Sequence, residues 1–234
     1  MKVIILAGGL GTRISEETAH KPKPMVLIDD KPLLWHVMNI YAQQGMDDFI
    51  IATGYKSEVI SDWVATLESP WKISTVNTGL NTQTGGRIKQ CMSLNAGERM
   101  LATYGDGVGN VNINKLLAFH EKHGKLATLT AVRPPARFGY LDLKDGQVLH
   151  FGEKNQSDAG WINGGYFVLE PEVADYIRGS SEPFETGALP RLAGEEKLMA
   201  FEHGGFWQPM DTLREKLDLT RFAKEVPPPW LKRL

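Results

Sequence analysis

The feature that most constrains this fold is an apolar run near the N-terminus that leads directly into a glycine-rich segment. Val3–Ala7 is a continuous aliphatic run, which is typical of a strand buried on both faces. Three of the next four residues are glycines: Gly8, Gly9 and Gly11. Because glycine has no Cβ, such a loop can turn successive backbone N–H groups toward a bulky anion. The pattern predicts a buried strand that ends in an anion-binding loop.

Two cationic side chains follow the loop and strengthen this prediction. Arg13 carries a forked, permanently charged donor that suits a pyrophosphate. Lys23 lies between two prolines, which restrict the local backbone and remove N–H donors, so its ammonium is presented from a stiff segment. Together the glycines and the two cations indicate a site for the phosphates of a nucleoside triphosphate.

Two common glycine-rich phosphate motifs do not fit the spacing. A dinucleotide fingerprint that begins at Gly9 needs a glycine where Ile14 stands, and a Walker-type loop that begins at Gly8 needs one where Arg13 stands. A tight strand-to-helix turn would also explain the glycines. It would leave Arg13 and the Lys-Pro-Lys-Pro stretch unexplained, so we favour a phosphate loop of another kind.

Composition argues for one globular domain without a general affinity for polyanions. The chain has 234 residues, 42% of them hydrophobic and 23% charged, enough for one large core. Its net charge of -2 and pI near 6.3 exclude a broad attraction to nucleic acid or to anionic membranes. The single cysteine, Cys91, excludes an internal disulfide, and no apolar run is long enough for a signal peptide or a membrane span. We therefore expect a cytoplasmic protein with no nucleic-acid or membrane partner.

Short apolar runs alternate with amphipathic segments along the first half of the chain. The expected strands are Val3–Ala7, Phe49–Thr53, Trp71–Val76 and Met100–Tyr104, and the expected helices are 31–44, 57–67, 84–94 and 111–123. This alternation predicts an α/β fold, with a mostly parallel, doubly wound (Rossmann-like) sheet and helices on both faces. Ligands of such sheets bind at the carboxyl ends of the strands, so the loops there are the places to look for chemistry.

Two aspartates are the candidate metal ligands. Asp106 follows an expected strand within Gly105-Asp106-Gly107, and Asp211 follows an aromatic, proline-containing segment at the start of an expected helix. Two carboxylates with water and phosphate oxygens are the ligands that Mg²⁺ usually takes. Ordinary turn chemistry would also explain Asp106, and a helix N-cap would explain Asp211.

Three further segments have both a functional and a structural interpretation. Thr82, Thr84, Gly85 and Arg87 offer donors for a nucleotide base, but a hydrophilic turn explains them equally well. His120 and His123 have helical spacing, which we interpret as a solvated helix face. Residues 227–230 are Pro-Pro-Pro-Trp, and we expect them to leave the domain as an extended tail.

Several segments carry a resemblance to a known family. Residues 8–13 with 21–25 resemble the signature of the sugar-phosphate nucleotidyltransferases, and residues 84–87, 104–107, 162–165 and 206–212 resemble the branch that joins CTP to glucose 1-phosphate. The resemblance implies a single domain, 1–234, with a nucleotide-binding half at about 1–125, a smaller sugar-phosphate-binding lobe at about 126–226 and a tail at 227–234. It also implies Mg²⁺ as the cofactor and a homo-oligomer.

The resemblance assigns roles to individual residues. The catalytic residues would be Arg13, Lys23 and Asp106, and the metal ligands Asp106 and Asp211. The nucleotide would contact Leu6, Ala7, Gly8, Gly9, Gly11, Thr12, Arg13, Thr82, Thr84, Gly85, Arg87 and Gly105, and the sugar phosphate would contact Gly139, Glu153, Lys154, Asn163 and Gly164.

Two alternatives remain open at this point. The same chemistry could use another sugar or polyol phosphate or another nucleoside triphosphate, or the domain could bind nucleotides without catalysis. The first alternative is supported by a difference from that branch. Where this chain has the short connection Glu68–Trp71, members of the branch usually carry a longer segment, and that segment helps neighbouring subunits complete each other's nucleotide site.

Overall fold

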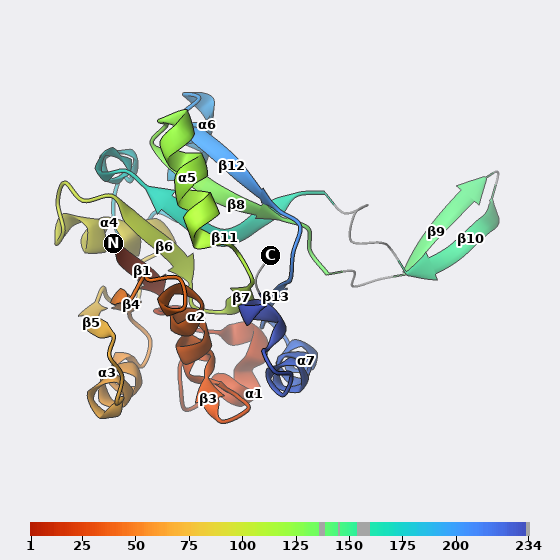
Figure 1. Cartoon of the computed structure of the whole chain (residues 1–234), viewed down its shortest axis with the longest axis horizontal. Coiled ribbons are helices and arrows are strands. Elements are labelled where there is room, and N and C mark those ends of the chain that lie inside the picture. The colour runs from red at the N-terminus through yellow and green to blue at the C-terminus, as the bar shows by residue number, and fades with distance from the viewer. Residues whose placement is uncertain (136–138, 145, 154–159, 233–234) are drawn as a thin grey trace.

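A seven-stranded sheet forms the centre of the molecule. The computed structural model describes residues 1–135, 139–144, 146–153 and 160–232, with the side chains of Arg13, residues 139–144 and residues 150–153 excepted. The strand order is β12-β8-β11-β6-β1-β4-β5, and every neighbouring pair is parallel except the two that involve β11 (Figure 1). The sheet is therefore mostly parallel, as predicted, with one antiparallel strand.

Strands and helices follow one another along the whole chain. The strands are β1 Lys2–Leu6, β2 Leu27–Ile28, β3 Lys31–Pro32, β4 Asp48–Thr53, β5 Lys72–Asn77, β6 Met100–Tyr104, β7 Gly107–Gly109, β8 Ala127–Val132, β9 Gly139–Lys144, β10 Gln147–Glu153, β11 Ile162–Leu169, β12 Leu198–His203 and β13 Trp207–Pro209. The helices are α1 Ser15–Thr18, α2 Leu33–Ala42, α3 Ser57–Thr66, α4 Thr84–Ser93, α5 Ile113–His123, α6 Ala188–Gly194 and α7 Leu213–Ala223, with 3-10 turns η1 Thr12–Ile14, η2 Lys23–Met25, η4 Pro171–Tyr176 and η5 Pro229–Leu231.

The two faces of the sheet carry separate hydrophobic clusters. Along β1, Val3 and Ile5 belong to one cluster and Ile4 and Leu6 to the other, as the two-residue period of a strand requires. Residues of α2, α3, α5 and α7 cover the first face, and residues of α4, η4 and α6 cover the second. Cys91 lies in the second cluster, where burial raises the pKa of its thiol to about 12. Helices on both faces explain why the central strands read as continuous apolar runs.

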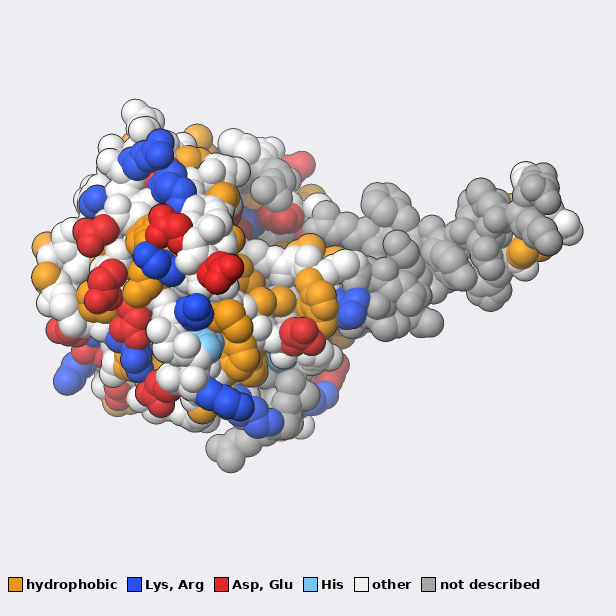
Figure 2. Space-filling model, turned by 90° about the horizontal axis from the view of Figure 1, so that it is seen from above, with side chains coloured by type: hydrophobic (Ala, Val, Ile, Leu, Met, Phe, Trp, Pro, Cys, Tyr) orange, Lys and Arg blue, Asp and Glu red, His pale blue; other side chains and the backbone are white. Residues whose placement is uncertain are grey.

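The hairpin of β9 and β10 stands away from the sheet as an arm (Figure 1). Acidic and basic side chains are interspersed over the face shown in Figure 2, which agrees with the small net charge. Among the described residues, no helix has both the length and the apolar character needed to cross a bilayer.

The end of the chain folds back onto the domain, so the prediction of an extended tail is wrong for residues 227–231. The prolines lead into η5, and Trp230 is only 2% exposed. Its ring contacts His36 at 5.4 Å and Phe206 at 6.2 Å between centroids. A tryptophan gains more by burying its large ring than a short tail gains in conformational freedom, and this tertiary contact overrides the local preference for an extended chain.

The prediction of a solvated face for His120 and His123 is also wrong. His120 is 1% exposed, and its Nδ1 lies 2.7 Å from Thr128 Oγ1 while its Nε2 lies 3.1 Å from Glu170 Oε1. His123 Nε2 shares the same hydroxyl at 2.7 Å. Both rings face β8 because α5 packs on that strand.

This buried cluster predicts that the fold loses stability on acidification. Burial lowers the pKa of His120 below its ordinary value of 6.5, although the Glu170 carboxylate opposes the shift. As the pH drops below 6.5, His120 is therefore protonated in the unfolded chain before it is protonated in the folded protein. The free energy of unfolding decreases over the range between the two pKa values of His120, by at most about 1.4 kcal/mol per pH unit for one proton. We expect His120→Gln to flatten the dependence of Tm on pH between 6.5 and 5. The matched change at the exposed His20 should leave it as steep as in the wild type, and equal slopes in all three proteins would contradict the assignment.

Candidate active site

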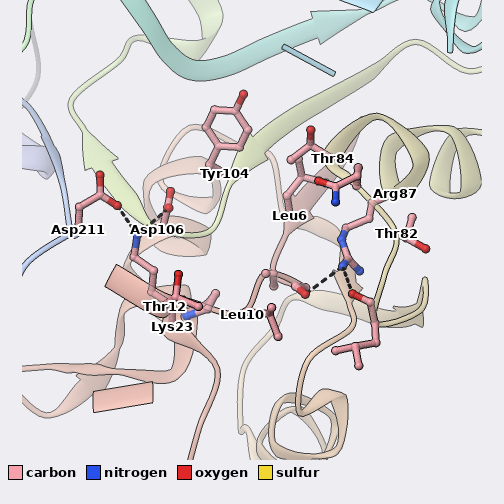
Figure 3. A pocket seen from close by; sticks show the side chains of 17 residues that line it. Leu6, Leu10, Thr12, Lys23, Thr82, Thr84, Arg87, Tyr104, Asp106 and Asp211 are labelled. Atoms are coloured by element: carbon pink, nitrogen blue, oxygen red, sulfur yellow. Dashed lines mark hydrogen bonds and ion pairs between the residues drawn. The ribbon is translucent and has the colours of Figure 1, made fainter. Parts of the chain in front are cut away.

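A cavity of about 390 Å³ opens at the carboxyl ends of β1 and β6. The loop after β1 and the first turn of α4 both contribute to its wall, and Lys23, Asp106 and Asp211 lie on the side away from Thr84 and Arg87 (Figure 3). The lining residues are Leu6, Ala7, Gly8, Gly9, Leu10, Gly11, Thr12, Lys23, Pro24, Leu80, Thr82, Gln83, Thr84, Arg87, Tyr104, Asp106 and Asp211. Segments from three distant parts of the chain therefore meet at the edge of the sheet where ligands of α/β proteins bind.

Lys23, Asp106 and Asp211 form the charged centre of the cavity. The Lys23 Nζ lies 2.8 Å from Asp106 Oδ2 and 2.7 Å from Asp211 Oδ1. The Lys23 side chain is 10% exposed, whereas the side chains of Asp106 and Asp211 are 43% and 19% exposed. The two carboxylates are therefore more accessible from the cavity than the ammonium between them (Figure 3). Burial alone would lower the pKa of Lys23, but the two carboxylates outweigh burial and raise it. Lys23 therefore remains a cation throughout the physiological pH range.

Pairing between two short strands brings the distant aspartates together. β7 begins one residue after Asp106, β13 ends two residues before Asp211, and the two strands pair antiparallel with Gly107 opposite Pro209. The Met210 N–H also donates to the Asp106 carbonyl at 2.8 Å. Because the register is held at both points, the two carboxylates approach the same ammonium.

Asp211 is not the cap of the helix that follows it. Thr212 is the N-cap of α7, and it forms a capping box with Glu215. Glu215 also accepts the Asp211 N–H at 2.6 Å, which orients the backbone of the aspartate. The N-cap interpretation of Asp211 is therefore wrong, and its carboxylate contacts Lys23 instead.

The two carboxylates fit a divalent cation. Both converge on one ammonium from distant parts of the chain, and carboxylate oxygen is the protein ligand that Mg²⁺ prefers. Within the described part of the chain, no group of three or more His, Cys, Asp or Glu side chains is arranged to hold a metal. A cation here would therefore take two protein ligands and complete its shell with water and phosphate oxygens.

Arg87 holds the glycine loop from inside the protein. It is 4% exposed, and its guanidinium donates to the Gly8 carbonyl at 2.9 Å, to the Thr53 carbonyl at 2.8 Å and to Thr78 Oγ1 at 2.6 Å. A Cβ on Gly8 would lie 2.1 Å from Arg87 Nη1, so the loop rests directly on this side chain. One cation thus ties together the loops that follow β1, β4 and β5.

Removal of this guanidinium should weaken the fold and the nucleotide site together. We expect Arg87→Met to lower the free energy of unfolding by about 2–4 kcal/mol, because it leaves several buried acceptors without a donor. The apparent KM for the nucleoside triphosphate should rise about tenfold, because the glycine loop loses its support. Denaturant unfolding and steady-state kinetics measure both effects. Arg214→Met, on the exposed face of α7, is the matched control, and equal behaviour of the two variants would rule out this role.

The other predicted site residues divide into three groups. The cavity includes most of the predicted nucleotide contacts, but Gly85 and Gly105 do not line it, and neither do the predicted sugar-phosphate contacts Asn163 and Gly164. The hydroxyls of Thr82 and Thr84 are engaged inside the protein, with the Thr78 carbonyl and with Glu185. The side chains of Arg13 and Glu153 and all of Lys154 lie outside the described residues, and Gly139 begins the β9–β10 arm.

Five lining residues were missed from the sequence. They are Leu10, Pro24, Leu80, Gln83 and Tyr104. Leu10, Pro24 and Tyr104 stand within the motifs themselves, where proximity to an assigned residue was the available signal. Leu80 and Gln83 precede α4 and are recognised only when the fold brings that helix to the cavity.

The fold and this charged centre define a family. The chain belongs to the nucleotidyl transferase family, whose model matches residues 2–223, and it is an enzyme of the sugar-phosphate nucleotidyltransferase class. It is 47% identical over 253 aligned positions to a glucose-1-phosphate cytidylyltransferase of Salmonella typhimurium, with 98% of both chains covered. A probable glucose-1-phosphate cytidylyltransferase of Bacillus subtilis is 38% identical, covering 98% of this chain and 99% of its own.

Solved structures share the fold. HddC from Yersinia pseudotuberculosis, solved in complex with GMP-PN, is 26% identical and superposes with a TM-score of 0.74 over 95% of this chain and 99% of its own. A thymidylyltransferase structure from Bacillus anthracis, described as putative in its own name, reaches a TM-score of 0.75 at 19% identity over 96% of each chain, which bears on the fold alone.

Proposed function

We propose that this enzyme condenses CTP with a sugar 1-phosphate, α-D-glucose 1-phosphate first, and releases pyrophosphate. The observation that carries the proposal is the meeting of Lys23, Asp106 and Asp211 beside the glycine loop. The two substrates are those in the names of the glucose-1-phosphate cytidylyltransferases to which the chain is similar. The proposal retains the division into a nucleotide half at about 1–125 and a sugar-phosphate half at about 126–226.

The proposed reaction is an in-line displacement at the α-phosphorus. An oxygen of the sugar phosphate forms a bond to the α-phosphorus. The bond from the α-phosphorus to the oxygen that bridges it to the β-phosphorus breaks, and pyrophosphate leaves with that electron pair. A phosphate monoester is largely dianionic near neutral pH, because its second pKa is near 6, and the attack needs no general base. The barrier is chiefly the repulsion between two polyanions and the cost of aligning them.

The residues of the cavity suit this task. The N–H groups of the loop from Gly8 to Thr12 would hold the departing phosphates, and the Lys23 ammonium would balance the charge on the reacting phosphoryl group. Asp106 and Asp211 would hold Mg²⁺, which when bound supplies further positive charge to the phosphate oxygens. The assigned roles of Arg13, Glu153 and Lys154 remain predictions.

One assay tests the proposal. Pyrophosphate release is measured with each of the four nucleoside triphosphates crossed against a panel of sugar and polyol phosphates, with and without Mg²⁺. The expected optimum is CTP with glucose 1-phosphate in the presence of Mg²⁺. An optimum at another pair would move the assignment to a related enzyme, and no release with any pair would leave a nucleotide-binding domain without catalysis.

A guanylyl-transferring enzyme is the second candidate. HddC, which shares the fold, was solved with GMP-PN, and a mannose-1-phosphate guanylyltransferase subunit of Dictyostelium discoideum is 31% identical over 91% of this chain. An optimum at GTP in the same assay would favour it.

We also propose that the protein forms a homo-oligomer and that it is located in the cytoplasm. Light scattering of the purified protein tests the first proposal, and cell fractionation tests the second.

A further inference from the structure

A chain of hydrogen bonds behind the cavity joins the first residue of α4 to the end of β6 and the start of β11. Thr84 Oγ1 donates to Glu185 Oε2 at 2.6 Å, and the Tyr104 hydroxyl donates to Glu185 Oε1 at 2.5 Å. Asn163 Nδ2 in turn donates to the Tyr104 hydroxyl at 3.1 Å. Thr84 opens α4, Tyr104 ends β6 and Asn163 is the second residue of β11, so one carboxylate connects α4 to β6 directly and to β11 through Tyr104.

The direction of every bond in this chain is determined. An ionised carboxylate only accepts, so both hydroxyls must donate to Glu185. Because the Tyr104 hydroxyl donates its only proton to Glu185, it must be the acceptor in its bond with Asn163. The NH₂ group of the Asn163 amide therefore faces the tyrosine. Independently, the Gly165 N–H donates to Asn163 Oδ1 at 2.9 Å and requires the same amide orientation. The Asn163 amide is therefore held in one orientation, with one N–H and one acceptor lone pair not used in these two bonds.

Packing places the Tyr104 ring as strictly as the hydrogen bonds do. A Cβ on Gly165 would lie 2.3 Å from Tyr104 Cδ2, and the ring meets Phe167 edge-on at 5.7 Å. The hydroxyl points away from Lys23 and Asp106, toward the side of the cavity where Thr84 lies (Figure 3). Glu185 itself does not line the cavity, so its contribution is made through its neighbours.

We propose that Glu185 is a positioning residue that holds Tyr104, and through it the Asn163 amide, in the orientation that recognises one hydroxyl of the sugar ring. Its second oxygen holds Thr84 at the start of α4, so the same carboxylate aligns the nucleotide side with the sugar side. This inference rests on the proposed function, because it assumes a sugar phosphate bound beside Asn163.

Three substitutions separate the two arms of the network. Tyr104→Phe keeps the ring and removes the sugar-side bond, and it should raise the KM for the sugar phosphate about tenfold with the KM for the nucleotide within twofold. Thr84→Val should do the reverse. Glu185→Gln should raise both constants, because its amide offers only one acceptor oxygen to two donors. A uniform loss of kcat without these shifts would overturn the proposal.

Deoxy analogues of the sugar phosphate test the orientation of Asn163 directly. We expect the wild type to discriminate against the analogue that lacks one particular ring hydroxyl, and Tyr104→Phe and Glu185→Gln to lose about tenfold of that discrimination. The control is Tyr176→Phe. It removes the hydrogen bond from the Tyr176 hydroxyl to Glu195, which has the same length of 2.5 Å, and neither residue lines the cavity. Unchanged discrimination in the site variants, or an equal change in the control, would refute the role.

A readout that needs no turnover distinguishes failure of this inference from failure of the proposed function. The side-chain NH₂ signals of Asn163 in a nitrogen-15 NMR spectrum should shift and exchange faster with water in Glu185→Gln, and should be unchanged in Tyr176→Phe. If the wild type proves inactive with every substrate pair, the proposed function fails while this test of positioning still applies. Identical Asn163 signals in wild type and Glu185→Gln would exclude positioning by Glu185.

Discussion

Replacement of Lys23 by methionine is expected to lower kcat for pyrophosphate release by about two to three orders of magnitude. The ammonium is nearly buried and lies within 2.8 Å of both acidic side chains, so its charge acts at short range where water screens it little. Methionine has a similar length and no charge. The fold should persist, because Asp106 is 43% exposed and can be hydrated once its partner is gone, which limits the loss of stability to about 1–2 kcal/mol.

Lys21→Met is the matched control for this prediction. It removes the same charge two residues earlier in the same proline-containing stretch, and its activity should remain within about twofold of the wild type because Lys21 does not line the cavity. Rapid-quench or steady-state measurement of pyrophosphate release, with Tm recorded for each variant, gives both quantities. Undiminished release by Lys23→Met would remove the lysine from the mechanism.

The second large effect is expected for Asp106→Asn and Asp211→Asn. Each should lower kcat about 10²–10³-fold and raise the Mg²⁺ concentration needed for half-maximal activity, because an amide oxygen is a weaker ligand for a hard cation than a carboxylate. The double variant should be little worse than either single one, since residues that act as one unit are not additive.

Asp218→Asn is the matched control for the aspartates. Its carboxylate lies on α7, the helix that follows Asp211, and pairs with Arg221 at 3.3 Å outside the cavity. It should retain wild-type activity and the same Mg²⁺ dependence. An unchanged Mg²⁺ requirement in Asp106→Asn and Asp211→Asn would exclude the two carboxylates as the metal ligands, whatever happened to kcat.

The segments that the sequence predicted well are those whose local pattern and tertiary environment agree. The run Val3–Ala7 became β1 at Lys2–Leu6, and the expected strand at 100–104 matches β6 completely, because a strand between helix layers must be apolar on both sides. The helix expected at 111–123 is α5 at Ile113–His123, and it ends at the C-cap Gly124, whose φ of 63° favours glycine. In these places one local preference was enough.

The errors arose where a distant segment changed the outcome. Trp230 and His120 looked like surface residues from their neighbours in sequence, but side chains from other elements, such as His36 for Trp230 and Glu170 for His120, pack against them and bury them. Arg87 was predicted to offer donors to a nucleotide base. In the structure it donates to the Gly8 carbonyl after β1 and to the Thr53 carbonyl at the end of β4, and its contact with a nucleotide stays a prediction.

Residue types and their spacing alone determined the alternation of strands and helices, the glycine loop and the identity of the two acids and the lysine. These follow from local physics: backbone freedom at glycine, restriction at proline, and the period of apolar residues. Only the tertiary structure decided that Asp106 and Asp211, more than a hundred residues apart, share one lysine, and that Glu185 connects Thr84 to Tyr104. Contacts of that kind depend on the register between β7 and β13 and on the packing of loops, which no local pattern records.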